Sequence, residues 1–343
     1  MATDKILLTQ TSQNTRIKKG GFLYENHKKA VLAIMCLSLA AFAPGKAHAA
    51  NKVQIPDGAC RKGNDIYYSY SGSGLRMDLM KINTKTHKKK MIVSNKYKGR
   101  TTNGFFDLNI KGNNIYATYN IVDGSDGFNF YICKINVKKK TKKLLTKGHH
   151  PIVIGNKIYF VKTKYNKTFY QDQDKGIYVM NLSGKKIRKV CKMPSSYISS
   201  LGSCGKSLVY EHTDSNQERV YTRLSKQGKR LGDLDPNDTI TSTYTSADSS
   251  YDCGVDNKSY YVTGGKVLCT DYNTDKTTTL VRYDSDHYGV QSFQVFGNVM
   301  VVRGHRQKYI KKYHYMGSKG YIYLIHLKKK PTKVLLKKYV CAE

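Results

Sequence analysis

Short apolar segments separated by polar turns recur along the chain from about residue 51 to its end. One kind of segment begins with a Gly-Asn turn and continues as a β-rich run, as in GNDIYY, GNNIYA and GNKIYF. The six copies, some of them degenerate, begin at intervals of 41 to 51 residues, at Gly63, Gly112, Gly155, Gly205, Asp256 and Gly297. Because Gly and Asn adopt the positive φ of tight hairpin turns, each copy predicts two antiparallel strands joined by a turn.

A second hairpin follows each of these turns. It consists of an apolar run, a polar and usually basic turn, and another apolar run, as in FYICKINVKKKTKKLL at residues 130–145. One more short run precedes each Gly-Asn turn, so each unit contains four predicted strands. Four-stranded units of about 40–50 residues are typical of β-propeller blades. The six units predict an all-β fold, a six-bladed β-propeller of four-stranded antiparallel blades over residues 51–343. A β-sandwich or a parallel solenoid explains the matched copies less well.

Residues 1–50 have the pattern of an export signal. Basic residues that include Lys28 and Lys29 precede the apolar stretch AVLAIMCLSLAAFAPG, which is followed by AHAA. A positive segment, a short apolar segment and an A-x-A site define a signal peptide, so we expect cleavage after Ala49 or Ala50. An uncleaved anchor is the alternative. We expect no membrane span after cleavage, and a monomer that is secreted or associated with the cell surface.

The repeated motifs carry a family resemblance. The G-N-x-I-Y strand followed by a hairpin with a lysine-rich turn resembles the six-bladed propellers of exported bacterial proteins. These form a domain family of unknown function that is described as similar to the propeller of low-density-lipoprotein-receptor-related proteins. The resemblance covers residues 51–343 and implies the fold, but no activity. The chain has no YWTD repeat and no tryptophan, so the ligand recognition of the receptor propellers does not carry over.

Charge is concentrated in the turn between the third and fourth strands of the units. The chain has 59 Lys and Arg against 24 Asp and Glu, a formal charge of +35. The basic turns predict a candidate anion-binding rim formed by Lys88, Lys89, Lys90, Lys138, Lys139, Lys140, Lys142, Lys143, Lys185, Lys186, Arg188, Lys229, Arg230, Lys328, Lys329 and Lys330. Unit 5 breaks this pattern with NTDKTTT, so we expect a gap in the rim there.

Two interpretations of these lysines remain open, and they are compatible. Lysines suit the spaced phosphates or carboxylates of an anionic polymer, without reading a sequence. Lysines also protect the exposed outer edge of a blade against pairing with another chain. Acidic residues are expected on the opposite face, in the turns between the second and third strands, namely Asp123, Asp126, Asp172, Asp174, Asp214 and Glu218.

Candidate chemistry is sparse. No nucleophile elbow, phosphate-binding loop or zinc motif occurs, and we expect neither a metal nor a cofactor. His149 and His150 are predicted to be a solvated pair, because adjacent residues of a strand point to opposite faces. If this is an enzyme, its chemistry is expected from some of Asp123, Asp174, Asp248, Asp252 and His287, and which of them converge at the mouth of the central channel stays open. A disulfide between Cys60 and Cys341 would join the two ends of the propeller, and free buried thiols are the alternative.

These observations favour an exported, non-catalytic interaction module. Its expected partner is a protein, teichoic acid or an anionic polysaccharide bound at the basic rim, and not a specific nucleic-acid sequence. The alternative is a hydrolase or lyase that acts on an extracellular glycan with carboxylates at the channel mouth. A scaffold whose partner binds the acidic face is a third hypothesis.

Overall fold

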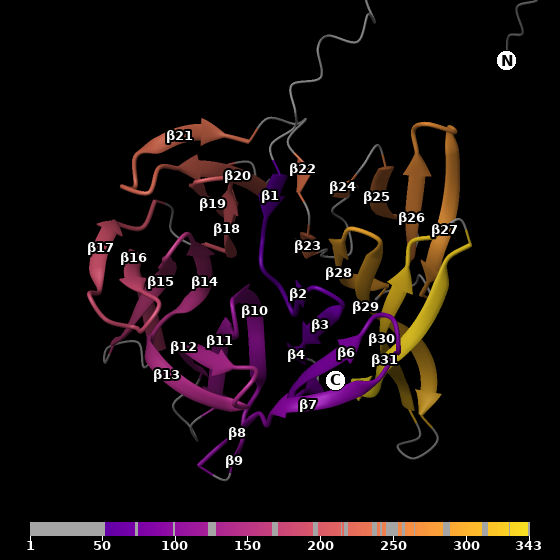
Figure 1. Cartoon of the computed structure of the whole chain (residues 1–343), viewed down its shortest axis with the longest axis horizontal. Coiled ribbons are helices and arrows are strands. Elements are labelled where there is room, and N and C mark those ends of the chain that lie inside the picture. Colours follow the sequence, from indigo (N-terminus) through magenta and orange to yellow (C-terminus); the bar gives the residue numbers. More distant parts are fainter. Residues whose placement is uncertain are drawn as a thin grey trace, which may run out of the picture. The chain divides into compact units, whose positions relative to one another are not determined.

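Six antiparallel sheets follow one another around a ring in the computed structural model (Figure 1). The structure describes residues 52–341 except 73–74, 99, 123–127, 167–170, 195–197, 214, 216–218, 235–238, 241, 245–252, 256–257, 264, 284–288, 311–314 and 329. The predicted signal peptide lies outside the described residues. All six sheets belong to one unit, Ala50–Glu343. The predicted all-β propeller with six four-stranded blades is confirmed.

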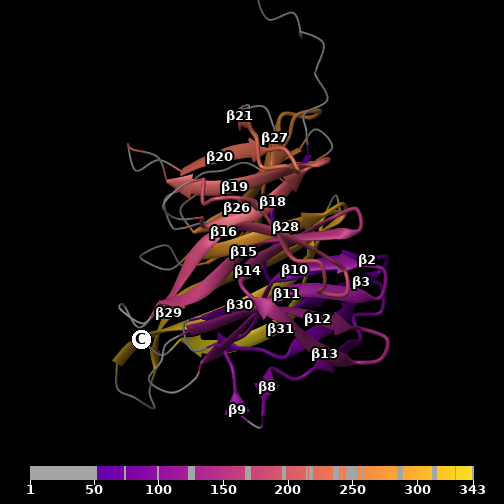
Figure 2. The same ribbon diagram turned by 90° about the vertical axis from the view of Figure 1, so that its left-hand side faces the viewer.

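Each blade is made from one continuous piece of chain. Blade 1 contains β2 (Ala59–Lys62), β3 (Asp65–Tyr68), β6 (Leu79–Asn83) and β7 (Lys89–Val93). Blade 2 contains β10 (Gly104–Lys111), β11 (Asn114–Val122), β12 (Phe128–Asn136) and β13 (Thr141–Lys147). Blade 3 contains β14 (His149–Ile154), β15 (Lys157–Asn166), β16 (Gln171–Asn181) and β17 (Arg188–Cys191). Figure 2 shows blades 4, 3 and 2 in succession from top to bottom.

The remaining blades repeat this order. Blade 4 contains β18 (Ser200–Cys204), β19 (Ser207–Thr213), β20 (Arg219–Leu224) and β21 (Arg230–Asp233). Blade 5 contains β24 (Cys253–Val255), β25 (Lys258–Thr263), β26 (Lys266–Asp271) and β27 (Lys276–Arg282). Blade 6 contains β28 (Val290–Phe296), β29 (Val299–Ile310), β30 (Tyr315–His326) and β31 (Thr332–Cys341). Two small hairpins, β4 (Ser71–Gly72) with β5 (Leu75–Arg76) and β8 (Lys96–Tyr97) with β9 (Arg100–Thr101), decorate blade 1 and its link to blade 2.

The Gly-Asn turns join the first two strands of the blades as predicted. Gly63, Gly112, Gly155, Gly205 and Gly297 all have φ between 58° and 61°. A Cβ atom at the first four of these positions would meet no other atom within 4 Å. The glycines are therefore required by the backbone conformation, which L-residues adopt only with strain, and not by crowding.

The core lies between the blades. Blades 1 and 2 share a cluster that includes Leu79, Phe105 and Ala117, and blades 6 and 1 share another that includes Tyr68 and Val301. Similar clusters join blades 2 and 3, 3 and 4, and 5 and 6. Because both faces of a sheet are covered, the apolar positions along the strands run almost continuously.

Three short strands occupy the centre of the ring. β1 (Lys52–Gln54) pairs antiparallel with the inner strand of blade 4 and parallel with β22 (Thr239–Ile240), while β23 (Ser242–Tyr244) pairs with the inner strand of blade 6. Gly202 of β18 makes room for β1, since a Cβ atom there would lie 2.5 Å from the carbonyl oxygen of Gln54. Figure 1 shows the chain passing from β1 toward β2 between the blades.

Candidate functional site

The predicted basic residues lie on and beside the turns between the third and fourth strands of the blades. Among the described residues, the exposed members of this set are Lys85, Lys88, Lys89, Lys90, Lys138, Lys139, Lys140, Lys143, Lys185, Lys186, Arg188, Lys189, Lys229, Arg230, Lys328, Lys330 and Lys333. Lys226 is half-buried, and Lys329 lies outside the described residues. We call this set, together with Lys142, the basic rim.

The turns between the first and second strands add cations to the same ends of the sheets. Lys62, Lys111, Lys157 and Lys206 are exposed next to the Gly-Asn turns. Antiparallel hairpins put these turns at the same end of a blade as the turn between strands three and four. The sequence signal for these four cations, which the prediction did not include, is a basic residue just before or just after the turn.

Two rim lysines are engaged with the preceding blade. The Lys142 ammonium group donates to the carbonyl oxygens of Ser94 (2.7 Å) and Lys96 (2.5 Å), and it lies 4.7 Å from the centre of the Tyr119 ring. Burial lowers the pKa of Lys142. The equivalent residue of blade 1, Lys89, donates to the carbonyl oxygen of Leu335 in blade 6 (2.7 Å). These two cations hold neighbouring blades together and are not free to bind a ligand.

Exposed apolar side chains lie beside the rim lysines. Met91, Leu231 and Leu335 are on outer strands, Ile187 directly precedes one, and they are 49%, 47%, 42% and 37% exposed. Outer strands that are apolar and unpaired are prone to pair with other chains, and adjacent lysines oppose this. The geometry thus supports edge protection as one role of the lysines.

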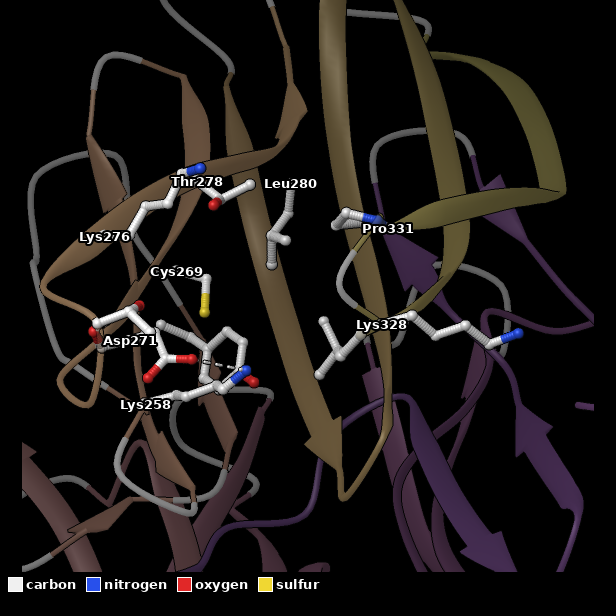
Figure 3. Close-up of a pocket in the computed structure, with 11 residues that line it drawn as sticks. Lys258, Cys269, Asp271, Lys276, Thr278, Leu280, Lys328 and Pro331 are labelled. Carbon is white, nitrogen blue, oxygen red and sulfur yellow. Dashed lines mark hydrogen bonds and ion pairs between the residues drawn. The ribbon is translucent and has the colours of Figure 1, made fainter.

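Blade 5 differs from the other blades at the rim, and a pocket lies there. Its turn carries Asp271 and Asp275 with only one lysine, Lys276. The cavity, about 400 Å³, lies between blade 5 and the β30–β31 turn of blade 6 (Figure 3). Its lining consists of Lys258, Tyr260, Cys269, Asp271, Thr274, Lys276, Thr278, Leu280, Leu327, Lys328 and Pro331.

Two histidines on the inner strand of blade 3 form histidine–carboxylate pairs, one with the inner strand of blade 2 and one with β16, the third strand of blade 3. Nδ1 of His150 lies 2.9 Å from Oδ2 of Asp107, and Nε2 of His149 lies 2.8 Å from Oδ1 of Asp174. The two imidazole side chains are only 15% and 12% exposed. The prediction of a solvated histidine pair is therefore wrong.

A bulge in each inner strand explains the error. Asp107 and His150 both lie five residues before a turn glycine, both have positive φ (55° and 50°), and the strand register shifts at both places. The simple alternation of side chains fails at a bulge. The bulges bring the two side chains together across the interface between the blades, where Thr118 also donates a hydrogen bond to Asp107 (2.6 Å).

The pKa values of the two histidines are shifted in opposite directions. Although burial alone would raise it, the charge and hydrogen bond of His150 hold the pKa of Asp107 below its usual value. Burial alone would lower the pKa of His150, but Asp107 raises it. Burial and the neighbouring His150 lower the pKa of His149. The Asp107–His150 pair is therefore an ion pair at mildly acidic pH.

Other candidate residues do not assemble into a site that the structure describes. Asp123, Asp126, Asp214, Glu218, Asp248, Asp252 and His287 lie outside the described residues, as does the side chain of Asp172. The acidic character of the opposite face stays a prediction. In the described part of the chain, no three His, Cys, Asp or Glu residues gather in a way that could hold a metal ion.

Cys60 is a free, buried thiol. It lies in the cluster between blades 1 and 2, whereas Cys341 ends the outer strand of blade 6. The structure therefore contains no disulfide between Cys60 and Cys341, because the Cys60 side chain packs on the side of blade 1 that faces blade 2. Cys133, Cys191, Cys204 and Cys269 are free thiols as well.

Comparisons with known proteins support the fold. No protein-family model and no curated protein match the chain, so the resemblance to the receptor-like propeller family stays a prediction. A puromycin-hydrolyzing peptidase of Mycobacterium tuberculosis is similar in structure, with a TM-score of 0.50 and 10% identity over 84% of this chain and 54% of that one. The chain thus spans about half the length of this peptidase.

Two further structures are similar at lower scores. The structure of YjhT matches with a TM-score of 0.45 and 12% identity, over 84% of this chain and 98% of that one. The propeller domain of the Trilobed protease of Pyrococcus furiosus matches with a TM-score of 0.32 and 13% identity, over 70% of this chain and 84% of that one. At such identities the likeness concerns the fold alone. The described residues include no helix with the length and apolarity needed to cross a membrane.

The engagement of Lys142 predicts unequal effects of two lysine substitutions in one hairpin. Lys142→Met is expected to lower the free energy of unfolding by about 2 kcal/mol, because hydrogen bonds from a charged group are lost. Lys139→Met, at the exposed tip of the same turn, is expected to change it by less than about 0.5 kcal/mol. Urea unfolding measures both, and equal effects would contradict the role of Lys142 between the blades.

The Asp107–His150 pair predicts a pH-dependent contribution to stability. The part due to His150 is present below its unfolded pKa of 6.5 and is lost as the pH rises through its raised folded value. The part due to Asp107 is present above its unfolded value of 3.8 and is lost as the pH falls through its lowered folded value. The pair therefore stabilises most between these two unfolded values.

Asp107→Asn tests this dependence. We expect the substitution to reduce the free energy of unfolding by about 3 kcal/mol at pH 5.5, as for a broken buried ion pair, and by clearly less at about pH 9, above the usual range of histidine titration. Asp65→Asn is the control, because the Asp65–Lys81 pair is more exposed and is worth less than about 1 kcal/mol. Urea unfolding at the two pH values gives the comparison. Equal losses at both pH values would refute the assignment.

Proposed function

We propose that this protein is an exported, monomeric and non-catalytic propeller that binds anionic polymers outside the cell through its basic rim. The observation that carries the proposal is the position of the exposed lysines, which recur on the equivalent turn of five blades and face solvent. Lysine ammonium groups bind spaced phosphates or carboxylates as point charges, and without strict geometry. Teichoic acid or an acidic polysaccharide has this chemistry.

Two further facts support a binding role. The net charge of +35 attracts polyanions and accelerates their association. The centre of the ring holds β1, β22 and β23, which reduces the space that a propeller enzyme uses for a polymeric substrate. The exposed rim, in contrast, is accessible to a long polymer.

If the basic rim binds polyanions, binding weakens steeply with salt concentration, and lysines in particular turns account for this dependence. We expect the retention of the protein on alginate or polyphosphate to fall with salt concentration, because bound counterions are released on binding. Replacing Lys138, Lys139 and Lys140 with glutamine is expected to reduce the slope of log K against log salt by roughly 2, at about 0.7 for each contact.

A variant with the same charge change serves as the control. Lys96, Lys98 and Lys164 are exposed at the other ends of the strands, and replacing these three with glutamine is expected to leave the slope nearly unchanged. Equal losses for the two triple variants would show that only net charge matters and would refute a specific rim. Unchanged retention in both would refute polyanion binding by this face.

A second candidate is a hydrolase or lyase acting on an extracellular glycan. The observation that favours it is the His149–Asp174 pair, which joins a base on the inner strand β14 to a carboxylate on β16. If this activity exists, Asp174→Asn is expected to lower kcat by about 100-fold and to leave retention on alginate intact. Reducing-end release from alginate and hyaluronan measures it, and turnover that persists in the variant would rule out this pair.

A further inference from the structure

The pocket between blades 5 and 6 lies at two repeat positions that hold small residues in blade 5 and lysines in blades 1 and 2. In blade 2, Lys134 pairs with Lys143 across β12 and β13, and in blade 1 Lys81 pairs with Lys90 at the same place. The blade 5 pair at this register is Cys269 with Thr278. Both residues line the cavity.

In blade 2 a side chain fills the equivalent space. The Lys134 ammonium group lies 5.9 Å from the centre of the Tyr116 ring and donates to the carbonyl oxygen of Leu182 in the next blade (3.2 Å). Tyr260 and Leu327 are the equivalents of Tyr116 and Leu182, counted from the turns of blades 5 and 6, and both line the pocket. Cys269 is too short to reach the place that the Lys134 ammonium group occupies in blade 2, so Tyr260, itself only 2% exposed, lines the base of a cavity there.

The lining has the chemistry of a site for a small polar ring. Tyr260, Leu280, Leu327 and Pro331 supply apolar surface, and Thr274 and Thr278 supply hydroxyl groups. Figure 3 shows the Cys269 sulfur and the Leu280 side chain directed into the space between the strands of blade 5 and the blade 6 turn. A volume of about 400 Å³ is at the small end of ligand pockets, which suits one or two rings.

The charges around the pocket favour an anion. Lys258 is paired with Asp271 at 3.1 Å, which leaves the positive charges of Lys276 and Lys328 uncompensated among the lining residues. Lys328 extends away from the cavity in Figure 3 and Lys258 is paired, so Lys276 is the candidate to pair with the negative group of a ligand. The pocket therefore combines an aromatic wall, hydroxyl groups and an excess of positive charge.

We propose that this pocket binds a single sugar ring that carries a carboxylate or phosphate group. The ring packs against Tyr260, Thr274 and Thr278 bond its hydroxyl groups, and Lys276 pairs with its negative group. The proposal depends on the function of the basic rim only for the source of the sugar, which would be one unit of a bound anionic polymer. The pocket itself binds the free sugar.

Calorimetric titration of the full propeller with glucuronate, glucose 6-phosphate and glucose tests this site. We expect both acidic sugars to bind at least about tenfold more tightly than glucose, the effect of one well-placed charge. The two acidic sugars separate carboxylate from phosphate as the preferred group. If neither acidic sugar binds, or if glucose binds equally well, the proposal is overturned.

Filling the pocket gives the sharper result. Cys269→Lys restores the residue found at this position in blades 1 and 2, and it adds a positive charge. We expect it to weaken both acidic sugars at least about tenfold, whereas pure electrostatic attraction would strengthen them. Cys269→Ala keeps the cavity open and is expected to retain binding. Tighter or unchanged binding by Cys269→Lys would overturn the proposal.

Lys276→Gln keeps the test decisive if Cys269→Lys fails to fold. Lys276 is exposed, so its replacement spares the core and is expected to remove the preference for acidic sugars over glucose. An unchanged preference would overturn the pairing with Lys276. The rim variant that lacks Lys138, Lys139 and Lys140 should bind the free sugars normally, so a failure of the rim and a failure of the pocket give different results.

Discussion

The packing of one blade against the next is the constraint on which the rest of this structure depends. Among the strands that the structure describes, the four main strands of each blade come from one continuous piece of chain, and none is exchanged with another blade. The ring is therefore closed by side chains, through the apolar cluster of blades 6 and 1 and through hydrogen bonds such as that from the backbone N–H of Ala59 to the Gln294 side chain (2.8 Å). Every position that faces a neighbouring blade is limited by this packing.

The same constraint divides the lysines into two groups. Lys89 and Lys142 turn back onto the preceding blade and bind its carbonyl groups, whereas Lys138, Lys139 and Lys140 extend into solvent at the hairpin tip. Within one hairpin, therefore, Lys142 contributes to stability, while lysines two to four residues away remain available to a partner. The proposed polymer-binding surface consists of the lysines that blade packing does not use.

Local sequence was sufficient to predict the features that depend on local conformation. The Gly-Asn turns, with φ near 60° at Gly63 and Gly112, and the basic hairpin from Phe128 to Lys147 follow from turn chemistry and from strand patterns. The repeat then predicted the number of blades. These inferences needed no knowledge of contacts between distant residues.

Features that depend on distant contacts could not be predicted in this way. The bulges at Asp107 and His150 break strand alternation, and the ion pair forms only because two blades meet there. The pairing of β1 with β18 joins Val53 to Cys204, and no pattern in either segment indicates the other. The pocket is an intermediate case, since the contrast between Lys134 and Cys269 is visible in an alignment of the repeats, but only with the observed register.

The central position of β1 has a consequence for how the chain reaches its native state. Val53 pairs with Cys204 in one direction and with Ile240 in the other, so this early strand has partners only after most of the chain has been made. Contacts between residues so far apart in sequence carry a large loop-closure cost and slow folding. Blades 1 to 3 can therefore form as the chain emerges, whereas β1 can pair only once blade 4 and β22 have been made.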